Sequence, residues 1–555
     1  MLRPLPLLTA LVLVGPVLAG LLGTLLPAFG IGPLRDGFSL DPFREAFSWP
    51  GLARAATVSL LSGMISTLGA LAIVALVLAA WHGTRAFAWL ERLLSPLLAV
   101  PHAATALGLA FVIAPSGWIA RLPAQALGWD RPPDLLILQD PLGLSLALGL
   151  IAKEVPFLLL MALAALPQLS AKPRLAVARS LGRGRVVGWL LAVFPDLYSR
   201  IRLPVMVVLV YGMTNVDMAA ILGPSTPPTL SVQIARWMMD PDLALRATAA
   251  AAAVIQLALV LFALAVWLAF ERLTSLLGKR MVWSAARLPE RSLRVAGLAL
   301  GAASAVAVFS SIAALAIWSV AARWSFPDLA PEAVTLRSWM RFGPAMADTA
   351  LTTAFIALSA TFISLIFTIG CLEAEHRHGI TASSRALWLL YLPLIVPQIA
   401  FLPGLQILPL WLGGDPGLAL VIAAHVVFVL PYVFLSLSGP FRAWDPRYAR
   451  VAAGLGAGAE RTLWRLRLPM LLAPVLTACA VGFAVSVGQY LPTLLLGGGR
   501  VPTLATEAVA LASGGDRRAI GVWGLGQTAA ALLPFALALA IPAILFRNRL
   551  GMRRE

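Results

Sequence analysis

The chain has 555 residues, of which 60% are hydrophobic and 12% are charged, and its formal net charge is +17. Soluble proteins contain roughly 45 to 50% apolar and about 25% charged residues, so a soluble, secreted, fibrous or disordered chain is excluded. Basic residues stand in short clusters between apolar runs, which argues against a nucleic-acid-binding face. The two cysteines, Cys371 and Cys479, provide neither a disulfide framework nor a cysteine-based metal site.

Apolar runs that can cross a membrane recur along the whole chain. A bilayer core of about 30 Å needs about 20 apolar residues per helix, and twelve such runs are present. They lie at residues 5–28, 55–80, 93–114, 142–166, 201–222, 248–270, 295–321, 349–370, 386–412, 418–437, 471–496 and 520–546. The sequence therefore predicts an all-α polytopic membrane protein with about twelve transmembrane helices. Four prolines inside the runs are expected to be tolerated where a neighbouring helix or water satisfies the freed backbone groups, namely Pro101, Pro156, Pro397 and Pro431.

The distribution of basic residues predicts the orientation of the chain. The first run follows Arg3 and also fits a cleavable signal peptide, but its more than twenty apolar residues favour a retained anchor. With the N-terminus in the cytoplasm, cytoplasmic loops hold 28 Lys and Arg and the opposite loops hold 13, while Lys153 lies inside a run. This bias predicts that both termini are cytoplasmic.

An internal repeat divides the chain into two halves. Gly182 and Gly456 are 274 residues apart, as are Pro195 and Pro469 and the tripeptides Pro-Thr-Leu at 228–230 and 502–504. Such a constant offset indicates two like units in parallel orientation. We therefore expect six-span units at residues 1–275 and 295–555, joined by a cytoplasmic linker at 276–294.

Between the fourth and fifth runs of each half lies a long cytoplasmic loop, at about 172–200 and 445–469. Each loop carries small residues, then Leu-Gly, and then a Pro that follows the Gly after 13 residues. Gly suits the end of a helix and Pro the first turn of the next, so the pattern predicts a helix, a turn and a helix at the membrane surface. Solvated basic loops would explain the charges but not the shared Gly-to-Pro spacing.

The two loops resemble the EAA loop of the membrane subunits of ATP-binding-cassette (ABC) importers. The resemblance implies two type I, MetI-like permease units whose short helices after Gly182 and Gly456 dock on two copies of a separate ATPase subunit. The coupling residues that it implies are Ala178, Leu181, Gly182, Arg183, Pro195, Ala452, Leu455, Gly456, Ala457, Glu460 and Pro469. Three positions depart from the family pattern: Ala176 and Arg450 stand where an acidic residue often begins the motif, and Phe194 precedes the first Pro.

The resemblance also implies partners and a class of solute. A periplasmic binding protein would deliver the solute, and a single chain of two fused units is typical of importers for iron(III), thiamine and related small cations. The stretch 486–518 is similar to that of thiamine-type fused permeases. No GxxxxGK[ST] phosphate loop occurs, so we expect no cofactor on this chain and ATP with Mg²⁺ on the partner ATPase.

Ionisable residues inside the runs are costly in lipid and are therefore candidates for function. Lys153 and Glu154 lie near the middle of the fourth run, where they either neutralise each other or face a water-filled pathway. Asn215 and Asp217 lie in the fifth run, where Asp217 either binds solute or is simply hydrated at the outer end of its span.

The repeat places further polar residues near this candidate pathway. Gln489 is the repeat-mate of Asn215, and Tyr490 follows it. An acidic residue, amides and an aromatic ring would suit a flat cation. His425 is expected to be an interhelical hydrogen-bond partner, and the run from Glu373 to His378 to be a solvated loop face rather than a metal cluster.

An ion-coupled secondary transporter is the alternative function, because such proteins also have twelve spans in two halves. It would use intramembrane carboxylates, of which Glu154 and Asp217 are available, but it leaves the paired loops unexplained. A third possibility, a membrane enzyme, is not supported by any catalytic motif, since neither HExxH nor GxSxG occurs in the sequence.

Overall fold

The structure is a computed structural model that describes residues 3–32, 37–283, 289–379, 384–411, 413–414 and 417–547. These residues form an almost entirely helical fold, and the only strands among them are β1 (Ala321–Arg323) and β2 (Ala333–Val334), which pair antiparallel. The predicted all-α membrane fold is confirmed.

The helical segments of each half follow one another with short connections. In the first half they are α1 (Leu5–Ala28), α2 (Asp41–Ser48), α3 (Leu52–Trp81), α4 (Arg85–Leu94), η1 (Ser95–Ala99), α5 (His102–Ile113), α6 (Trp118–Ala124), α7 (Leu144–Ala165), η2 (Leu166–Gln168), α8 (Ala171–Ser180), α9 (Arg185–Ala192), α10 (Phe194–Thr214), α11 (Asp217–Leu222), α12 (Leu230–Met238) and α13 (Leu245–Trp283). In the second half they are α14 (Glu290–Val320), α15 (Arg337–His378), α16 (Ser384–Ile395), α17 (Gln398–Trp411), α18 (Leu418–Arg442), α19 (Pro446–Gly454), α20 (Ala459–Thr462), η3 (Leu463–Arg467), α21 (Leu468–Met470), α22 (Leu472–Val487), α23 (Leu491–Leu496), α24 (Leu504–Leu511) and α25 (Arg517–Leu545).

The predicted spans are found as helices, but not all of them are continuous. Among the described residues nine helices are long and apolar enough to cross a membrane, or up to eleven when each of two bent pairs is one span. One pair, Trp388–Ile395 and Gln398–Pro409, bends by 86°, and the other, Ala459–Met470 and Leu472–Val487, bends by 77°. The predicted fifth span is also broken, because α10 ends at Thr214 and α11 begins at Asp217.

Proline explains part of this difference. Pro156 and Pro431 lie inside the continuous helices α7 and α18, as expected. At Pro101 and Pro397, in contrast, one helix ends and another begins directly after the proline. Proline has no amide hydrogen and disfavours helical geometry in the residue before it, so these two runs divide instead of continuing.

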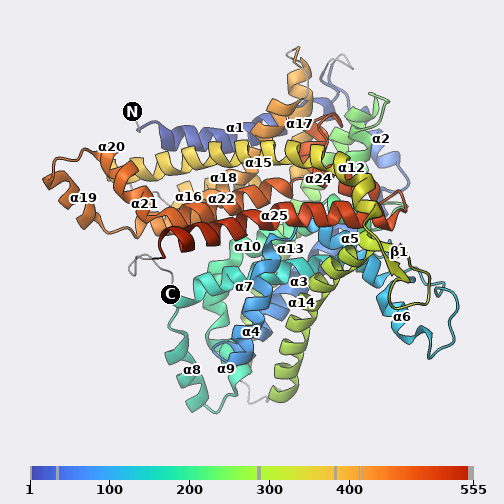
Figure 1. The fold of residues 1–555 in the computed structure, drawn as a ribbon, viewed down its shortest axis with the longest axis horizontal. Coiled ribbons are helices and arrows are strands. Elements are labelled where there is room, and N and C mark those ends of the chain that lie inside the picture. The colour runs from blue at the N-terminus through green and yellow to red at the C-terminus, as the bar shows by residue number, and fades with distance from the viewer. Residues whose placement is uncertain are drawn as a thin grey trace.

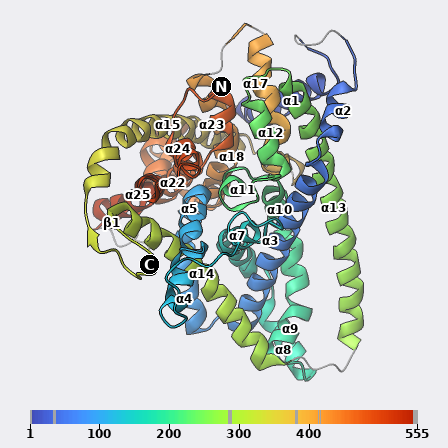
Figure 2. The same cartoon turned by 90° about the vertical axis from the view of Figure 1, so that its right-hand side faces the viewer.

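The first helix of each half packs on the other half. Helix α1 lies against α17, and α14 lies against α5 and α3 (Figures 1 and 2). Glycines permit the close approach: a Cβ added to Gly404 would overlap the carbonyl oxygen of Gly20, and one added to Gly108 would overlap that of Ser311. The Gly404 amide also donates to the Thr24 hydroxyl at 2.9 Å. The two halves are therefore interlocked through their first helices.

The sequence repeat corresponds to repeated contacts in space. In each half the Leu of the Pro-Thr-Leu tripeptide begins a short helix, and its amide donates to a hydroxyl of a long helix. A glutamine on the last long helix of each half donates to the backbone just before the helix break. The matched bonds are Leu230 to Ser59 (3.0 Å), Leu504 to Thr353 (2.9 Å), Gln256 to Met213 (3.2 Å) and Gln527 to Val487 (3.5 Å).

A reciprocal pair of arginines also joins the halves at the end of the molecule that carries α6 and β1 (Figure 1). Arg121 of the first half donates to the Ser325 carbonyl at 2.7 Å, and its guanidinium lies 4.9 Å from the Trp324 ring centroid. Arg517 of the second half donates to the Ser116 hydroxyl at 2.6 Å. Buried guanidinium groups of this kind are held by carbonyls and aromatic faces.

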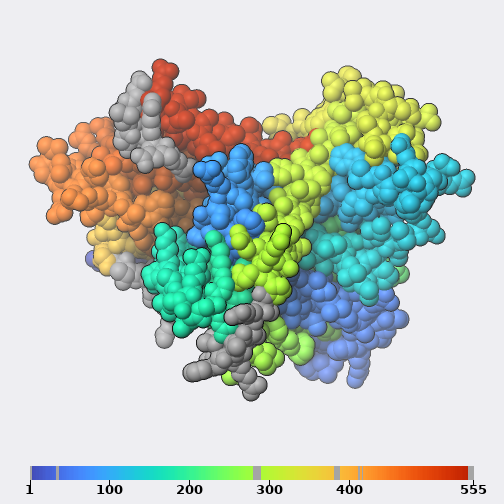
Figure 3. Space-filling view, turned by 90° about the horizontal axis from the view of Figure 1, so that it is seen from below, coloured from blue at the N-terminus to red at the C-terminus, as the bar shows by residue number. Residues whose placement is uncertain are grey.

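The opposite end carries both chain ends and the two long loops. In Figure 1 the start of α1, the end of α25, α8 and α19 all lie toward the left. Helices α8 and α9 and helices α19 and α20 are separate parts of the surface in Figure 3. The two loops thus lie at the end opposite to α6, one on each half.

We predict that Gly404→Ala lowers the free energy of unfolding by about 1 to 3 kcal/mol, because the added methyl group separates α1 from α17. Gly278→Ala in α13 is the control, since nothing lies within 4 Å of its added Cβ, and a gain of up to about 1 kcal/mol is expected. Unfolding in detergent measures both variants. Equal shifts in the two proteins would contradict the close α1–α17 contact.

Candidate functional site

The loop of the first half forms a helix, a glycine turn and a second helix. Helix α8 ends at Ser180, and Gly182 has φ +76°, the left-handed conformation that lets the chain reverse. Leu181 is 75% exposed, whereas Trp189 of α9 is 3% exposed. Helix α9 packs on α3, α10 and α14, so only α8 and the turn are open to a partner.

The loop of the second half repeats this geometry. Asp445 caps α19 by accepting from the Arg447 amide, and Gly456 has φ +77°. Leu455 is 84% exposed, and no residue of α19 is buried. Each loop therefore presents an exposed short helix that ends in an exposed leucine and a left-handed glycine.

In the first half the helix before the glycine is the exposed one, because the apolar residues of α9 are buried by the chain's own helices. In the second half residues of both α19 and α20 are exposed. The docking by the helices after Gly182 and Gly456 that the resemblance implies stays a prediction. Pro195 and Pro469 stand in the first turns of α10 and α21, as their spacing predicts. Ala178 is buried against α9, whereas Ala452 and Ala457 are half-buried.

A carboxylate from the second half holds α9 in place. Both oxygens of Glu290, the first residue of α14, accept from the Val186 amide at 3.1 and 3.0 Å, and one accepts from the Val187 amide at 3.1 Å. Gly184 leaves room for this contact, since a Cβ there would overlap the carboxylate. A negative charge at a helix N-terminus satisfies the free amides and the helix dipole. The first-half loop is thereby tied to the first helix of the second half.

An ion-pair network holds the corresponding part of the second half. Glu373 pairs with Arg377 at 2.7 Å and with Arg467 at 2.5 Å, and Arg377 also pairs with Glu460 at 2.8 Å. Glu460, expected to be a coupling residue, therefore connects α20 to α15. The expectation that the Glu373–His378 run is a solvated loop face is wrong, because Glu373 is buried in α15 between two arginines.

A polar centre lies at the helix breaks inside the molecule. Asp217, the first residue of α11, is 7% exposed and so is not hydrated at an open helix end. Glu154 of α7 is 5% exposed and lies 3.8 Å from Nε2 of His102, the first residue of α5. The His102 ring packs against Tyr211 with centroids 4.9 Å apart. Tyr211 is also within electrostatic range of Asp217 and Glu154.

The second half contributes tyrosines to the same centre. Tyr490, which precedes α23, is within electrostatic range of Asp217, and Tyr432 of α18 is within range of Glu154. Asn215 accepts from the Ala219 amide through Oδ1 at 3.0 Å. No described contact brings Gln489 into the centre through its side chain; its backbone carbonyl accepts from the Thr493 hydroxyl at 2.8 Å.

Lys153 has a different role from that of its neighbour. Its ammonium donates to the carbonyls of Leu97 and Val100 at 2.9 and 2.6 Å, directly before Pro101. Lys153 and Glu154 are therefore not a closed pair, because the ammonium is used to satisfy the backbone where η1 gives way to α5. The carbonyls freed by the break at Pro101 find their donor in this side chain.

His425 connects three helices by hydrogen bonds, as expected. Its Nδ1 lies 2.7 Å from the Ser486 hydroxyl of α22, and its Nε2 lies 2.9 Å from the Thr493 hydroxyl of α23. Both ring nitrogens are thus occupied by the chain itself.

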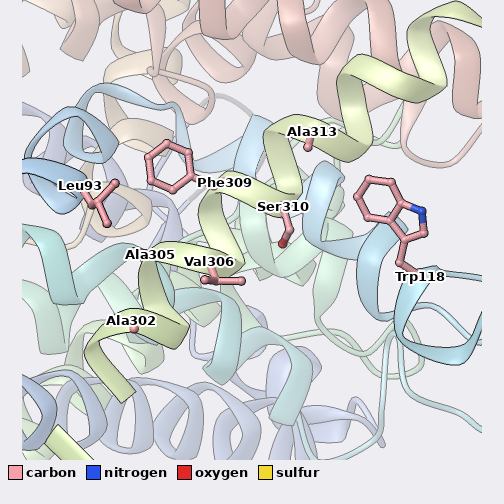
Figure 4. A pocket seen from close by; sticks show the side chains of 8 residues that line it. All are labelled: Leu93, Trp118, Ala302, Ala305, Val306, Phe309, Ser310 and Ala313. Carbon is pink, nitrogen blue, oxygen red and sulfur yellow. The ribbon is translucent and has the colours of Figure 1, made fainter. Parts of the chain in front are cut away.

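A cavity of about 350 Å³ lies along α14, away from the polar centre. Figure 4 shows Leu93 at one end of it and Trp118 at the other. Its lining residues are Leu93, Trp118, Ala302, Ala305, Val306, Phe309, Ser310 and Ala313. Its one hydroxyl, that of Ser310, already donates to the Ala307 carbonyl at 3.0 Å, so the cavity offers no partner for a charged solute.

Comparison with known proteins connects this geometry to a family. The family described as "Binding-protein-dependent transport system inner membrane component" matches residues 366–550. The inner membrane ABC transporter permease protein YnjC of Escherichia coli strain K12 is 30% identical over 511 residues, which cover 91% of each chain. The chain belongs to this ABC transporter permease family. The permease is thus a multi-pass inner-membrane protein of a transport system that includes an ATPase and a periplasmic binding protein.

Shorter relatives match parts of the permease. The 2-aminoethylphosphonate transport system permease protein PhnV of Salmonella typhimurium is 24% identical over 244 residues, covering 87% of its own length but 43% of this chain. The spermidine/putrescine transport system permease protein PotC of Haemophilus influenzae is 25% identical over 144 residues, covering 26% of this chain and 54% of its own. The family assignment decides against the ion-coupled secondary transporter. Since these names specify different solutes, the solute has to be argued from the residues of the permease.

Three residues of the polar centre, His102, Tyr211 and Tyr432, were missed in the sequence. Two of them stand beside prolines inside apolar runs, at Pro101 and Pro431. A polar residue next to an intramembrane proline is the signal that could have identified them, because helix breaks collect polar groups.

We predict that Glu290→Gln lowers the free energy of unfolding by about 1 to 2 kcal/mol, because the amide caps α9 less well than the carboxylate does. Glu332→Gln is the control, since the Glu332 carboxylate is exposed and its ion pair with Arg323 is long, at 3.6 Å. Thermal unfolding of the purified permease compares the two. A loss at Glu332 as large as that at Glu290 would contradict the capping role.

Proposed function

We propose that this permease forms the whole translocation pathway of an ABC importer for a small solute and that two copies of its ATPase dock on α8 and α19. The observation that carries the proposal is the pair of matched exposed helices at one end of the molecule, each ending in an exposed leucine and a left-handed glycine. Further exposed apolar side chains lie on the same helices, namely Val177 on α8 and Tyr448 and Val451 on α19. Exposed apolar patches mark interaction surfaces.

In this proposal residues 1–275 and 295–555 are two permease units, and 276–294 is the linker between them. The repeated hydrogen bonds at Leu230 and Leu504 support this division. The interlocked first helices mean that neither unit is complete without the other. One chain then forms a pathway that would otherwise need two separate permease subunits of half this length.

The orientation follows from the docking surfaces. Helices α8 and α19 and both chain ends lie toward the same end, which would be the cytoplasmic one because the basic loops are found there. The opposite end, with α2, α6 and β1, would receive the loaded periplasmic binding protein. ATP and Mg²⁺ would be bound by the ATPase subunits, and the permease itself would bind no cofactor and perform no catalysis.

The transport cycle would follow from the position of the two loops, one on each half. Closure of the two ATPase subunits on ATP would bring α8 and α19 together, and rigid connections through Glu290 and through Glu373 would pass this movement to the long helices. The halves would then separate at their outer end, and hydrolysis would return them, which is alternating access. The solute would be thiamine-like or another small cation.

We predict that Leu181→Asp and Leu455→Asp each reduce ATP-dependent uptake more than about tenfold and release the ATPase during purification, because a charge replaces an exposed apolar contact. Leu136→Asp is the control, since Leu136 is 69% exposed in the loop after α6. Retention of the ATPase and of uptake in both variants would refute the docking surfaces. Uptake that continues without ATP would favour a different transport class.

A further inference from the structure

We propose that the polar centre is an asymmetric cation site, in which carboxylates of the first half and tyrosines of the second half bind a small organic cation. The inference rests on the proposed transport function and adds the residues that recognise the solute. The site consists of His102, Glu154, Tyr211, Asp217, Tyr432 and Tyr490.

The charges of the centre do not balance within the chain. Glu154 and Asp217 are buried carboxylates, and among the described residues Lys153 is the ammonium within their electrostatic range. It donates to the carbonyls of Leu97 and Val100, and its single charge offsets only one of the two carboxylates. His102 adds a positive charge only when it is protonated. A buried carboxylate without a counter-charge is costly, so a cation that enters the centre is favoured and an anion is repelled.

Unused hydrogen-bonding groups point to a ligand at the same place. Among the described residues, no hydrogen bond to the Glu154 carboxylate is found, and Nε2 of His102 lies 3.8 Å from it, although the residue is 5% exposed. Asn215 is 6% exposed, and its Nδ2 has no partner. Buried polar atoms in proteins are nearly always paired, so the remaining ones call for a partner that the chain does not supply.

The centre departs from the symmetry of the surrounding fold. At the repeat offsets of 274 and 275 residues, Asp217 corresponds to Leu491 and Glu154 to Val429. In the same way Tyr490 corresponds to Val216 and Tyr432 to Phe157. The acids therefore occur only in the first half and these phenols only in the second. A fused chain can hold such a difference, whereas two identical subunits would present the same groups twice.

The arrangement selects a class of solute. Tyr211, Tyr432 and Tyr490 are half-buried and the His102 side chain is 35% exposed, so the chain does not enclose any of the four completely. Aromatic faces attract cations, and phenol hydroxyls can accept or donate at the rim. Two buried carboxylates with aromatic rings beside them suit a compact, flat organic cation with its charge next to Glu154 and Asp217.

The test uses the purified full-length permease in nanodiscs, with thiamine as the cation probe and molybdate as the anion probe, and follows the midpoint of thermal unfolding. Thiamine should raise the midpoint in a saturable way, and molybdate should not. Glu154→Gln and Asp217→Asn should each weaken the apparent affinity for thiamine about tenfold or more, as expected for loss of a charge-assisted contact. Asp348→Asn, at an exposed position on α15, is the control and should behave as the parent does.

Three outcomes would overturn the proposal: stabilisation by molybdate, no stabilisation by thiamine, or undiminished thiamine affinity in both variants. Tyr490→Phe, which keeps the ring, provides a further reading if either carboxylate variant unfolds. It should weaken thiamine binding measurably, but by less than the tenfold expected for loss of a carboxylate, and unchanged affinity would count against the site. Retention of the ATPase tests the transport function separately. If the permease keeps its ATPase but thiamine does not stabilise it, only the proposed cation site is refuted.

Discussion

The constraint on which this structure depends is the absence of water in the bilayer core, where every backbone amide and carbonyl must find a partner in the protein itself. Long helices satisfy it along most of the chain. Where helices break inside the molecule, side chains from elsewhere fill the gap: Lys153 serves the carbonyls before Pro101, while Gln256 and Gln527 serve the ends of α10 and α22. Polar groups are thus concentrated at the breaks, and the candidate solute site lies there.

The same molecule combines a symmetric scaffold with asymmetric chemistry. Helix packing, the hydroxyl contacts at Leu230 and Leu504, and the glycine turns at Gly182 and Gly456 are repeated in both halves. The buried acids are not repeated. The connections behind the docking helices also differ, since a single carboxylate, Glu290, caps α9, whereas a four-residue network of Glu373, Arg377, Glu460 and Arg467 supports α20. The two halves are therefore held by different contacts at the same end of the molecule.

Sequence reasoning succeeded where the cause is local and failed where it is tertiary. Turn chemistry at Gly182 and Gly456 acts within a few residues, so the helix, turn and helix were predicted correctly. The positions of the apolar runs were also correct, but their continuity was not, because Pro101 and Pro397 behave differently from Pro156 and Pro431. Which of two short helices is exposed depends on packing against α3 and α14, which no local pattern contains.

The interlocked first helices have a consequence for biogenesis. Helix α1 leaves the ribosome before α17, and Gly404, which donates to Thr24 of α1, follows 380 residues later. Until α17 is inserted, the small-residue face of α1 has no permanent partner and must remain in the bilayer against lipid or an insertion factor. Completion of this contact thus waits for translation of the second unit, so a chain truncated before α17 would leave this face of α1 uncovered, with α13 as its main remaining partner.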